Sequence, residues 1–119
     1  MKIAAIGSGA WGKNIVRTLH HMGVLQTVAE ASPVLREQLA LDYPGLETVS
    51  NYGELFSRSD IAAVTIATPA PTHHRIAKDC LLAGKDVFVV QDAASSRTLE
   101  NKLAGIERMR AAGVHIVTT

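Results

Sequence analysis

The sequence has one cysteine, few aromatic residues and no long apolar run, and each shortage excludes a class of protein. Cys80 stands alone, so no disulfide can form within the chain, which is usual in a reducing compartment. Phe, Trp and Tyr make up only 4% of the residues, too few for a platform that stacks nucleic-acid bases. No run reaches the length of a membrane span, and residues 3–6 are too short for a signal peptide. We expect a cytoplasmic protein.

Length and charge indicate one ordinary globular domain. The formal net charge is +1, so no basic field favours nucleic acid or an anionic membrane as partner. Apolar residues make up 47% of the 119 positions, enough to form a buried core. We therefore expect a single domain over residues 1–119.

The most informative segment is a glycine turn near the amino terminus. Gly7-Ser8-Gly9-Ala10-Trp11-Gly12 has the spacing GxGxxG, follows an apolar run and precedes a helical pattern. Gly7 permits a tight turn, Gly9 lets the backbone approach a phosphate, and Gly12 lets the helix pack closely on the strand. The free N–H groups and the positive dipole end of the following helix then face the phosphates. The turn predicts a site for a dinucleotide.

Strand and helix patterns alternate behind this turn. Strands are expected at residues 3–6, 24–30, 47–49, 61–67, 86–90 and 114–118. The buried helix faces are expected to comprise Trp11, Ile15, Leu19 and Met22; Leu35, Leu39 and Ala40; Ile76, Cys80 and Ala83; and Leu99, Leu103 and Ile106. The candidate helix caps are Ser32, Asn51 and Thr72. Because residues 61–67 are nearly all apolar, they indicate a parallel strand covered on both faces. The fold class is α/β, a doubly wound parallel sheet of the Rossmann type.

An acidic residue ends the second expected strand. Glu30 lies 18 residues after Gly12, where this fold places the group that accepts hydrogen bonds from the adenosine ribose. A carboxylate there repels the 2′-phosphate of NADP, and Arg36 lies a helical turn further along the chain. NAD is therefore favoured over NADP, while the alternative interpretation of Glu30 is a solvated residue before a helix.

Two further loops are expected at the same edge of the sheet. One is 68–73, with Thr68, Pro69 and His73, and the other begins at Gln91. His73 and His74 are adjacent and so face different ways on a helix, and no cluster of Cys or carboxylate side chains accompanies them. We expect no metal site, and we expect Cys80 to be a core residue.

Three ordered segments resemble one known family. Residues 7–14, the Ala67-Thr68-Pro69 segment with His73, and residues 83–89 are similar to the glucose–fructose oxidoreductase/inositol dehydrogenase (Gfo/Idh/MocA) family. The similarity spans essentially the whole chain. Residues 11–14 and 43–45 look most like members that act on nucleotide-linked amino sugars.

The resemblance implies an NAD(P)-dependent dehydrogenase acting on a sugar, polyol or nucleotide-sugar hydroxyl. It implies cofactor contacts from Gly7, Ser8, Gly9, Ala10, Trp11, Gly12, Glu30, Thr68, Pro69, His73 and Gln91. It also implies a second α/β domain that carries most of the substrate site. The sequence ends at Thr119, where that domain would begin, so we expect the family C-terminal domain to be absent here.

One departure from the family concerns catalysis. Where the family usually has Glu-Lys-Pro, this chain has Val90-Gln91-Asp92. The family lysine reaches the substrate and the nicotinamide, whereas the amide of Gln91 has no titratable proton. General acid–base work by one such group is worth about 10²–10⁴-fold. No residue of this chain is therefore assigned a catalytic role.

Three hypotheses remain at this point. The first is a cofactor-binding domain of a sugar dehydrogenase, which binds a dinucleotide without efficient turnover. The second is a non-catalytic nucleotide-sensing or partner-binding module. The third, a methyltransferase with a similar first turn, does not account for residues 68–69 and 84–89. An uncovered last strand would invite self-association, so a homodimer is expected.

Overall fold

A parallel sheet organises the molecule. The computed structural model describes residues 2–9, 12–91 and 113–118. Within these residues the strands are β1 (Ile3–Ile6), β2 (Leu25–Ala29), β3 (Glu47–Val49), β4 (Ala63–Ile66), β5 (Asp86–Gln91) and β6 (His115–Thr118). They lie in the order β3-β2-β1-β4-β5-β6, and every pair is parallel. The predicted doubly wound Rossmann sheet is confirmed.

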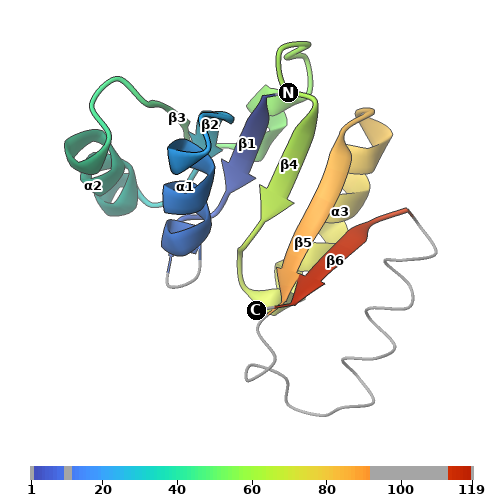
Figure 1. Ribbon diagram of the computed structural model, residues 1–119. Coiled ribbons are helices and arrows are strands. Elements are labelled where there is room, and N and C mark those ends of the chain that lie inside the picture. The colour runs from blue at the N-terminus through green and yellow to red at the C-terminus, as the bar shows by residue number, and fades with distance from the viewer. Residues whose placement is uncertain (1, 10–11, 92–112, 119) are drawn as a thin grey trace.

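Helices cover the two faces of the sheet. Helices α1 (Gly12–His21) and α2 (Pro33–Asp42) lie on one face, over β1 and β2. Helix α3 (His73–Leu82) and the 3-10 helix η1 (Tyr52–Leu55) lie on the opposite face (Figure 1). A second 3-10 turn, η2 (Ala70–Thr72), leads into α3. The chain moves outward in opposite directions from β1 and from β4, so their carboxyl ends flank the switch point of the fold.

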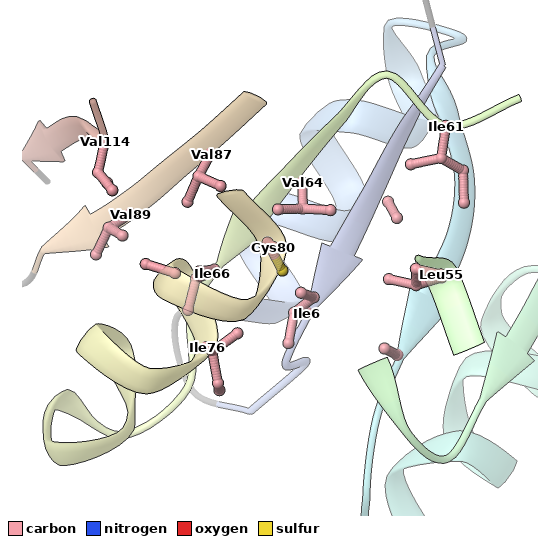
Figure 2. Packing of buried hydrophobic residues seen from close by; sticks show 13 residues of the cluster. Ile6, Leu55, Ile61, Val64, Ile66, Ile76, Cys80, Val87, Val89 and Val114 are labelled. Atoms are coloured by element: carbon pink, nitrogen blue, oxygen red, sulfur yellow. The ribbon is translucent and has the colours of Figure 1, made fainter. Parts of the chain in front are cut away.

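The buried core has one apolar cluster on each face of the sheet. On the α3 side it includes Ile6, Leu55, Val64, Ile66, Ile76, Cys80, Val87 and Val89 (Figure 2). On the α1 side it comprises Ala5, Val16, Leu19, Val28 and Leu39. Cys80 is completely buried, which confirms its predicted core role, and this burial raises the pKa of its thiol to about 11.

Most local signals are confirmed where the structure describes them. The Ser32 hydroxyl accepts a hydrogen bond from the Leu35 N–H, and Pro33 opens α2. Asn51 and Glu54 form the predicted capping box of η1. Thr72 is at the N-cap position of α3, but its hydroxyl makes no capping bond; it donates to the Pro69 carbonyl oxygen instead.

Other expectations need correction or lie outside the described residues. Met22 is 67% exposed, because α1 ends at His21 before another turn can bury it. Ala40 is exposed as well, while Val16 and Ala77, which the periodicity did not single out, are buried. The expected helix with Leu99, Leu103 and Ile106 lies outside the described residues, as do Ala10, Trp11 and Asp92.

Candidate dinucleotide site

The glycine turn lies at the switch point and is hydrogen-bonded to the neighbouring β2. The Gly7 N–H donates to the carbonyl oxygen of Ala29 at 2.9 Å, at the end of β2. On the other side of β1, the Ala67 N–H donates to the Ile6 carbonyl oxygen at 2.9 Å. The turn therefore begins at a fixed position between the ends of β2 and β4.

The three glycines of the turn have different surroundings. Gly7 has φ +93°, and a Cβ there would lie 2.9 Å from the Ala67 carbonyl oxygen. A Cβ on Gly12 would collide with the Gly7 carbonyl group, whose carbon would be 2.7 Å away. A Cβ on Gly9 would meet no atom of the described residues within 4 Å. Gly7 and Gly12 thus permit the packing of the turn, whereas the space beside Gly9 is open to a ligand.

The amino terminus of α1 is suited to an anion. Its first turn contains no acidic side chain, and Lys13 is exposed there. The Lys13 N–H donates to the Gly9 carbonyl oxygen at 3.0 Å, which closes the first turn of the helix. The positive end of the helix dipole therefore lies beside Gly9, where it favours a phosphate. These features fit the pyrophosphate of a dinucleotide.

Glu30 follows β2 and is bonded to the glycine turn. Its Oε1 accepts hydrogen bonds from the Ser8 N–H and the Ser8 hydroxyl, both at 2.8 Å. Its Oε2 accepts from the Ser32 N–H at 3.0 Å. The predicted position of Glu30 beside the turn is therefore confirmed, but its bonds to Ser8 and Ser32 were not foreseen.

Two opposing effects act on the Glu30 carboxyl. Partial burial raises its pKa, whereas hydrogen bonds from the Ser32 N–H and from the hydroxyl and N–H of Ser8 lower it. The bonds outweigh the burial, so the pKa of Glu30 lies below its usual value. Glu30 is a carboxylate at neutral pH and accepts hydrogen bonds only.

Arg36 lies closer to the end of β2 than its place one helical turn further along the chain predicted. Arg36 Nη1 donates to the Glu30 carbonyl oxygen at 2.7 Å and to the Ala31 carbonyl oxygen at 3.1 Å. Side chains of a helix lean toward its amino terminus, so the first turn of α2 returns this guanidinium to the end of β2. This tendency of helical side chains is the sequence signal from which the position of the Arg36 guanidinium could have been predicted.

The loop after β4 is the second wall of the switch point. The His73 ring is buried, and its Nε2 lies 2.6 Å from the Thr68 carbonyl oxygen. The Thr68 and Thr72 hydroxyl oxygens are 2.6 Å apart. Pro69 is exposed between them. Thr68 and His73 thus belong to one small hydrogen-bond network. This network lies beside the glycine turn, because a Cβ built on Gly7 would be only 3.0 Å from Thr68 Cγ2.

The remaining predicted positions are described only in part. The backbone of Gln91 ends β5 and pairs with Thr118 of β6, which puts it at the same edge of the sheet as Gly7. Among the described residues, no three His, Cys, Asp or Glu side chains gather as a metal site. No helix in the described part of the chain is long and apolar enough to cross a membrane.

Comparisons with known proteins agree with this geometry. The sequence model of the Gfo/Idh/MocA group, an oxidoreductase family with an NAD-binding Rossmann fold, matches residues 1–90. An inositol 2-dehydrogenase from Rhodococcus erythropolis is 33% identical over 103 residues, which cover 81% of this chain and 30% of that protein. The chain thus spans about a third of the length of that relative.

Solved structures share the fold. A putative myo-inositol dehydrogenase from Sinorhizobium meliloti superposes with a TM-score of 0.75 at 23% identity, covering 100% of this chain and 36% of that one. The WlbA dehydrogenase from Chromobactrium violaceum, in complex with NADH and UDP-GlcNAcA, gives 0.72 at 20% identity, covering 100% and 34%. With the family match over residues 1–90, the chain belongs to the Gfo/Idh/MocA oxidoreductase family through its NAD-binding Rossmann domain.

Proposed function

We propose that this chain is the cofactor platform of an NAD-dependent oxidoreductase. The observation that carries the proposal is the glycine turn beside the Glu30 carboxylate, with no described atom in the space beside Gly9 and the amino terminus of α1 next to it. In this proposal the turn holds the pyrophosphate and Oε2 of Glu30 accepts from an adenosine ribose hydroxyl. Thr68, Pro69 and His73 line the side toward the nicotinamide.

We infer that NAD is preferred over NADP, although groups of opposite charge lie at the end of β2. The Glu30 carboxylate repels a 2′-phosphate, while the Arg36 guanidinium attracts one. Arg36 Nη1 already donates to two backbone carbonyl oxygens. The ribose hydroxyls of NAD, in contrast, match the acceptor that Glu30 offers.

The proposed substrate is a sugar, polyol or nucleotide-sugar hydroxyl. The relatives that support this class are the inositol 2-dehydrogenases and, for nucleotide sugars, the WlbA complex with UDP-GlcNAcA. When bound, the nicotinamide cofactor supplies the hydride acceptor or donor, and the protein supplies binding and orientation. Because the chain has Gln91 at the position of the family lysine, we expect cofactor binding without efficient turnover.

Calorimetric titration with NAD, NADH, NADP and NADPH tests the proposal. We expect both NAD forms to bind and to bind more tightly than the corresponding NADP forms. Absence of binding of all four at millimolar concentration would refute the cofactor role. Tighter binding of NADPH than of NADH would refute the preference and would indicate Arg36 as the stronger group.

A non-catalytic nucleotide-sensing module is the alternative function. It shares the glycine turn and is favoured by the neutral Gln91 amide. The two proposals differ in hydride transfer by the longest natural form of the protein. Reduction of NAD by that form with a panel of polyols and nucleotide sugars supports the dehydrogenase; cofactor binding with no reduction supports the module.

A further inference from the structure

The carboxylate of Glu30 has little capacity left for a ribose. A carboxylate offers about four lone-pair directions, two on each oxygen. Both directions of Oε1 are taken by the N–H and the hydroxyl of Ser8, and one direction of Oε2 is taken by the Ser32 N–H. At most one direction is left for a ribose hydroxyl, and a backbone hydrogen bond from Ala31 also acts on this carboxyl and lowers its pKa. Most of the bonding capacity of Glu30 is therefore directed at its own protein.

Ser8 is the residue on which these bonds converge. It is only 5% exposed and lies between Gly7, which has φ +93°, and Gly9, beside which a Cβ would find open space. A buried backbone N–H must have an acceptor, and Glu30 supplies it here. Because the two flanking glycines have more backbone freedom than any other residue, the hydrogen bonds between Ser8 and Glu30, here called the Ser8–Glu30 tie, restrain the most flexible part of the turn.

We propose that Glu30 is a positioning residue for the pyrophosphate, holding the Gly7–Gly9 segment in its phosphate-accepting shape through Ser8. This role is additional to any contact between Glu30 and the ribose, and it rests on the proposed binding of a dinucleotide. A turn that is held in its bound shape before the ligand arrives loses less conformational entropy on binding. Removing the tie should then weaken every ligand with a pyrophosphate, whether or not that ligand has ribose hydroxyls.

The decisive ligands are ADP and 2′,3′-dideoxy-ADP, which both carry a pyrophosphate and differ only in the ribose hydroxyls. Their affinities are measured by displacement of NADH fluorescence for the wild-type chain, Glu30→Ala and Ser8→Ala. Since one hydrogen bond contributes about 2- to 13-fold in an equilibrium constant, Glu30→Ala should weaken both ligands by about tenfold or more. Ser8→Ala removes one tie and leaves the carboxylate intact, so it should weaken both by about two- to fivefold.

Three outcomes overturn the positioning role. The first is loss of ADP affinity in Glu30→Ala with dideoxy-ADP affinity unchanged, which is the pattern of a ribose ligand alone. The second is a Ser8→Ala variant equal to wild type with both ligands. The third is an equal loss in Glu37→Ala, a matched control, because Glu37 is an exposed glutamate on α2. Circular dichroism melts confirm that each variant is folded.

Amide exchange in the ligand-free chain provides an independent measurement that does not depend on ligand affinity. By ¹⁵N nuclear magnetic resonance, the Ser8 N–H should exchange about tenfold faster in Glu30→Ala than in wild type, and Glu30→Gln, which keeps one acceptor oxygen, should restore part of the protection. Unchanged Ser8 exchange in Glu30→Ala refutes the tie. If the wild-type chain bound no NADH, the proposed function would fail, while the exchange rates would still show whether Glu30 restrains the turn.

Discussion

The imidazole of His73 donates its Nε2–H to the backbone carbonyl oxygen of Thr68 at 2.6 Å, which joins the first residue of α3 to the loop after β4. A carbonyl oxygen can only accept, so Nε2 carries the proton and the neutral ring leaves Nδ1 as an acceptor. The ring is 6% exposed. Together with the bonds that Thr72 makes to Thr68 and Pro69, this bond holds the loop that we propose to line the nicotinamide side of the site.

The burial of His73 predicts a pH dependence of stability. Burial lowers the pKa of His73 below its ordinary value of 6.5, and the bond to Thr68 raises it by less. The folded state therefore favours the neutral ring, and the corresponding stability is present above pH 6.5 and lost as pH falls through the folded pKa. Urea unfolding between pH 7.5 and about 5 should show wild type losing its advantage over His73→Gln.

The neighbouring histidine supplies the control for that measurement. His74 is exposed, so His74→Gln should follow the wild-type curve at every pH. A free-energy difference between wild type and His73→Gln that does not change over this interval would contradict the assigned shift.

The surroundings of Gly9 and Gly12 predict that alanine at Gly9 weakens cofactor binding, whereas alanine at Gly12 lowers the stability of the fold. Gly9→Ala adds a methyl group to open space, so the fold should be retained while the methyl group obstructs the phosphate. Overpacking of this kind costs about 1–3 kcal/mol, or roughly 5- to 150-fold in the Kd for NADH. Gly12→Ala places the methyl group against the Gly7 carbonyl, and this clash should lower the free energy of unfolding by about 1–3 kcal/mol. The loss should exceed the ~1 kcal/mol that alanine contributes as a better helix former than glycine.

Urea unfolding and NADH titration of both variants separate the two effects. An unstable Gly9→Ala, or a Gly12→Ala with wild-type stability, would show that the roles of these glycines have been assigned wrongly.

Sequence patterns predicted the fold well because its signals are local. The spacing of Gly7, Gly9 and Gly12, the Ser32 cap and the alternation of strands and helices each depend on a few neighbouring residues. The short strand 47–49 was predicted with the bounds that the structure has. The exposure of Met22 was not predictable from periodicity, because it depends on where α1 ends.

The candidate site was predictable as a set of positions but not as a network. That Glu30 would lie near the glycine turn follows from the order of the strands. The bonds from Ser8 and Ser32 depend on rotamers and loop geometry that no spacing encodes. The same holds for Arg36, whose guanidinium returns to the end of β2 only in three dimensions.

Substitution of Lys85, which lies outside the candidate cofactor site, is predicted to lower the stability of the fold. This lysine is 8% exposed, and its Nζ donates to the carbonyl oxygens of Arg58 and, at 2.7 Å, of Ile61. The bonds hold the segment before β4 against the turn after α3. Lys85→Met would remove both of these bonds, although the Arg58 carbonyl oxygen would keep the one from the Ile61 N–H at 3.3 Å. The free energy of unfolding should therefore fall by about 1–3 kcal/mol.

Urea unfolding of Lys85→Met beside Lys78→Met provides the comparison. Lys78 is exposed on α3, and its substitution should change stability by no more than about 0.5 kcal/mol. Equal effects of the two substitutions would refute the role of Lys85 as a tie between loops.

The half of the sheet beyond β1 predicts self-association. Ala5, Thr65, Phe88 and His115 are aligned across four strands, so their side chains point to the face that α1 and α2 cover over β1 and β2. Among the described strands, β6 pairs with β5 alone and is therefore an edge of the sheet. The Phe88 and His115 rings stack on each other between β5 and β6, with their centroids 4.8 Å apart, and His115 is exposed. We predict that a second copy of the chain associates through the β6 edge and that the chain forms a homodimer.

Light scattering at increasing protein concentration measures the association. His115→Lys puts a charged side chain on the exposed edge strand β6 and should shift the population to monomer, because charge on an edge strand opposes its pairing. Val34→Lys is the matched control, since Val34 is 74% exposed on α2 and lies outside the contact. A monomeric wild-type chain at high concentration would contradict the dimer, and equal dissociation of both variants would place the contact elsewhere on the surface.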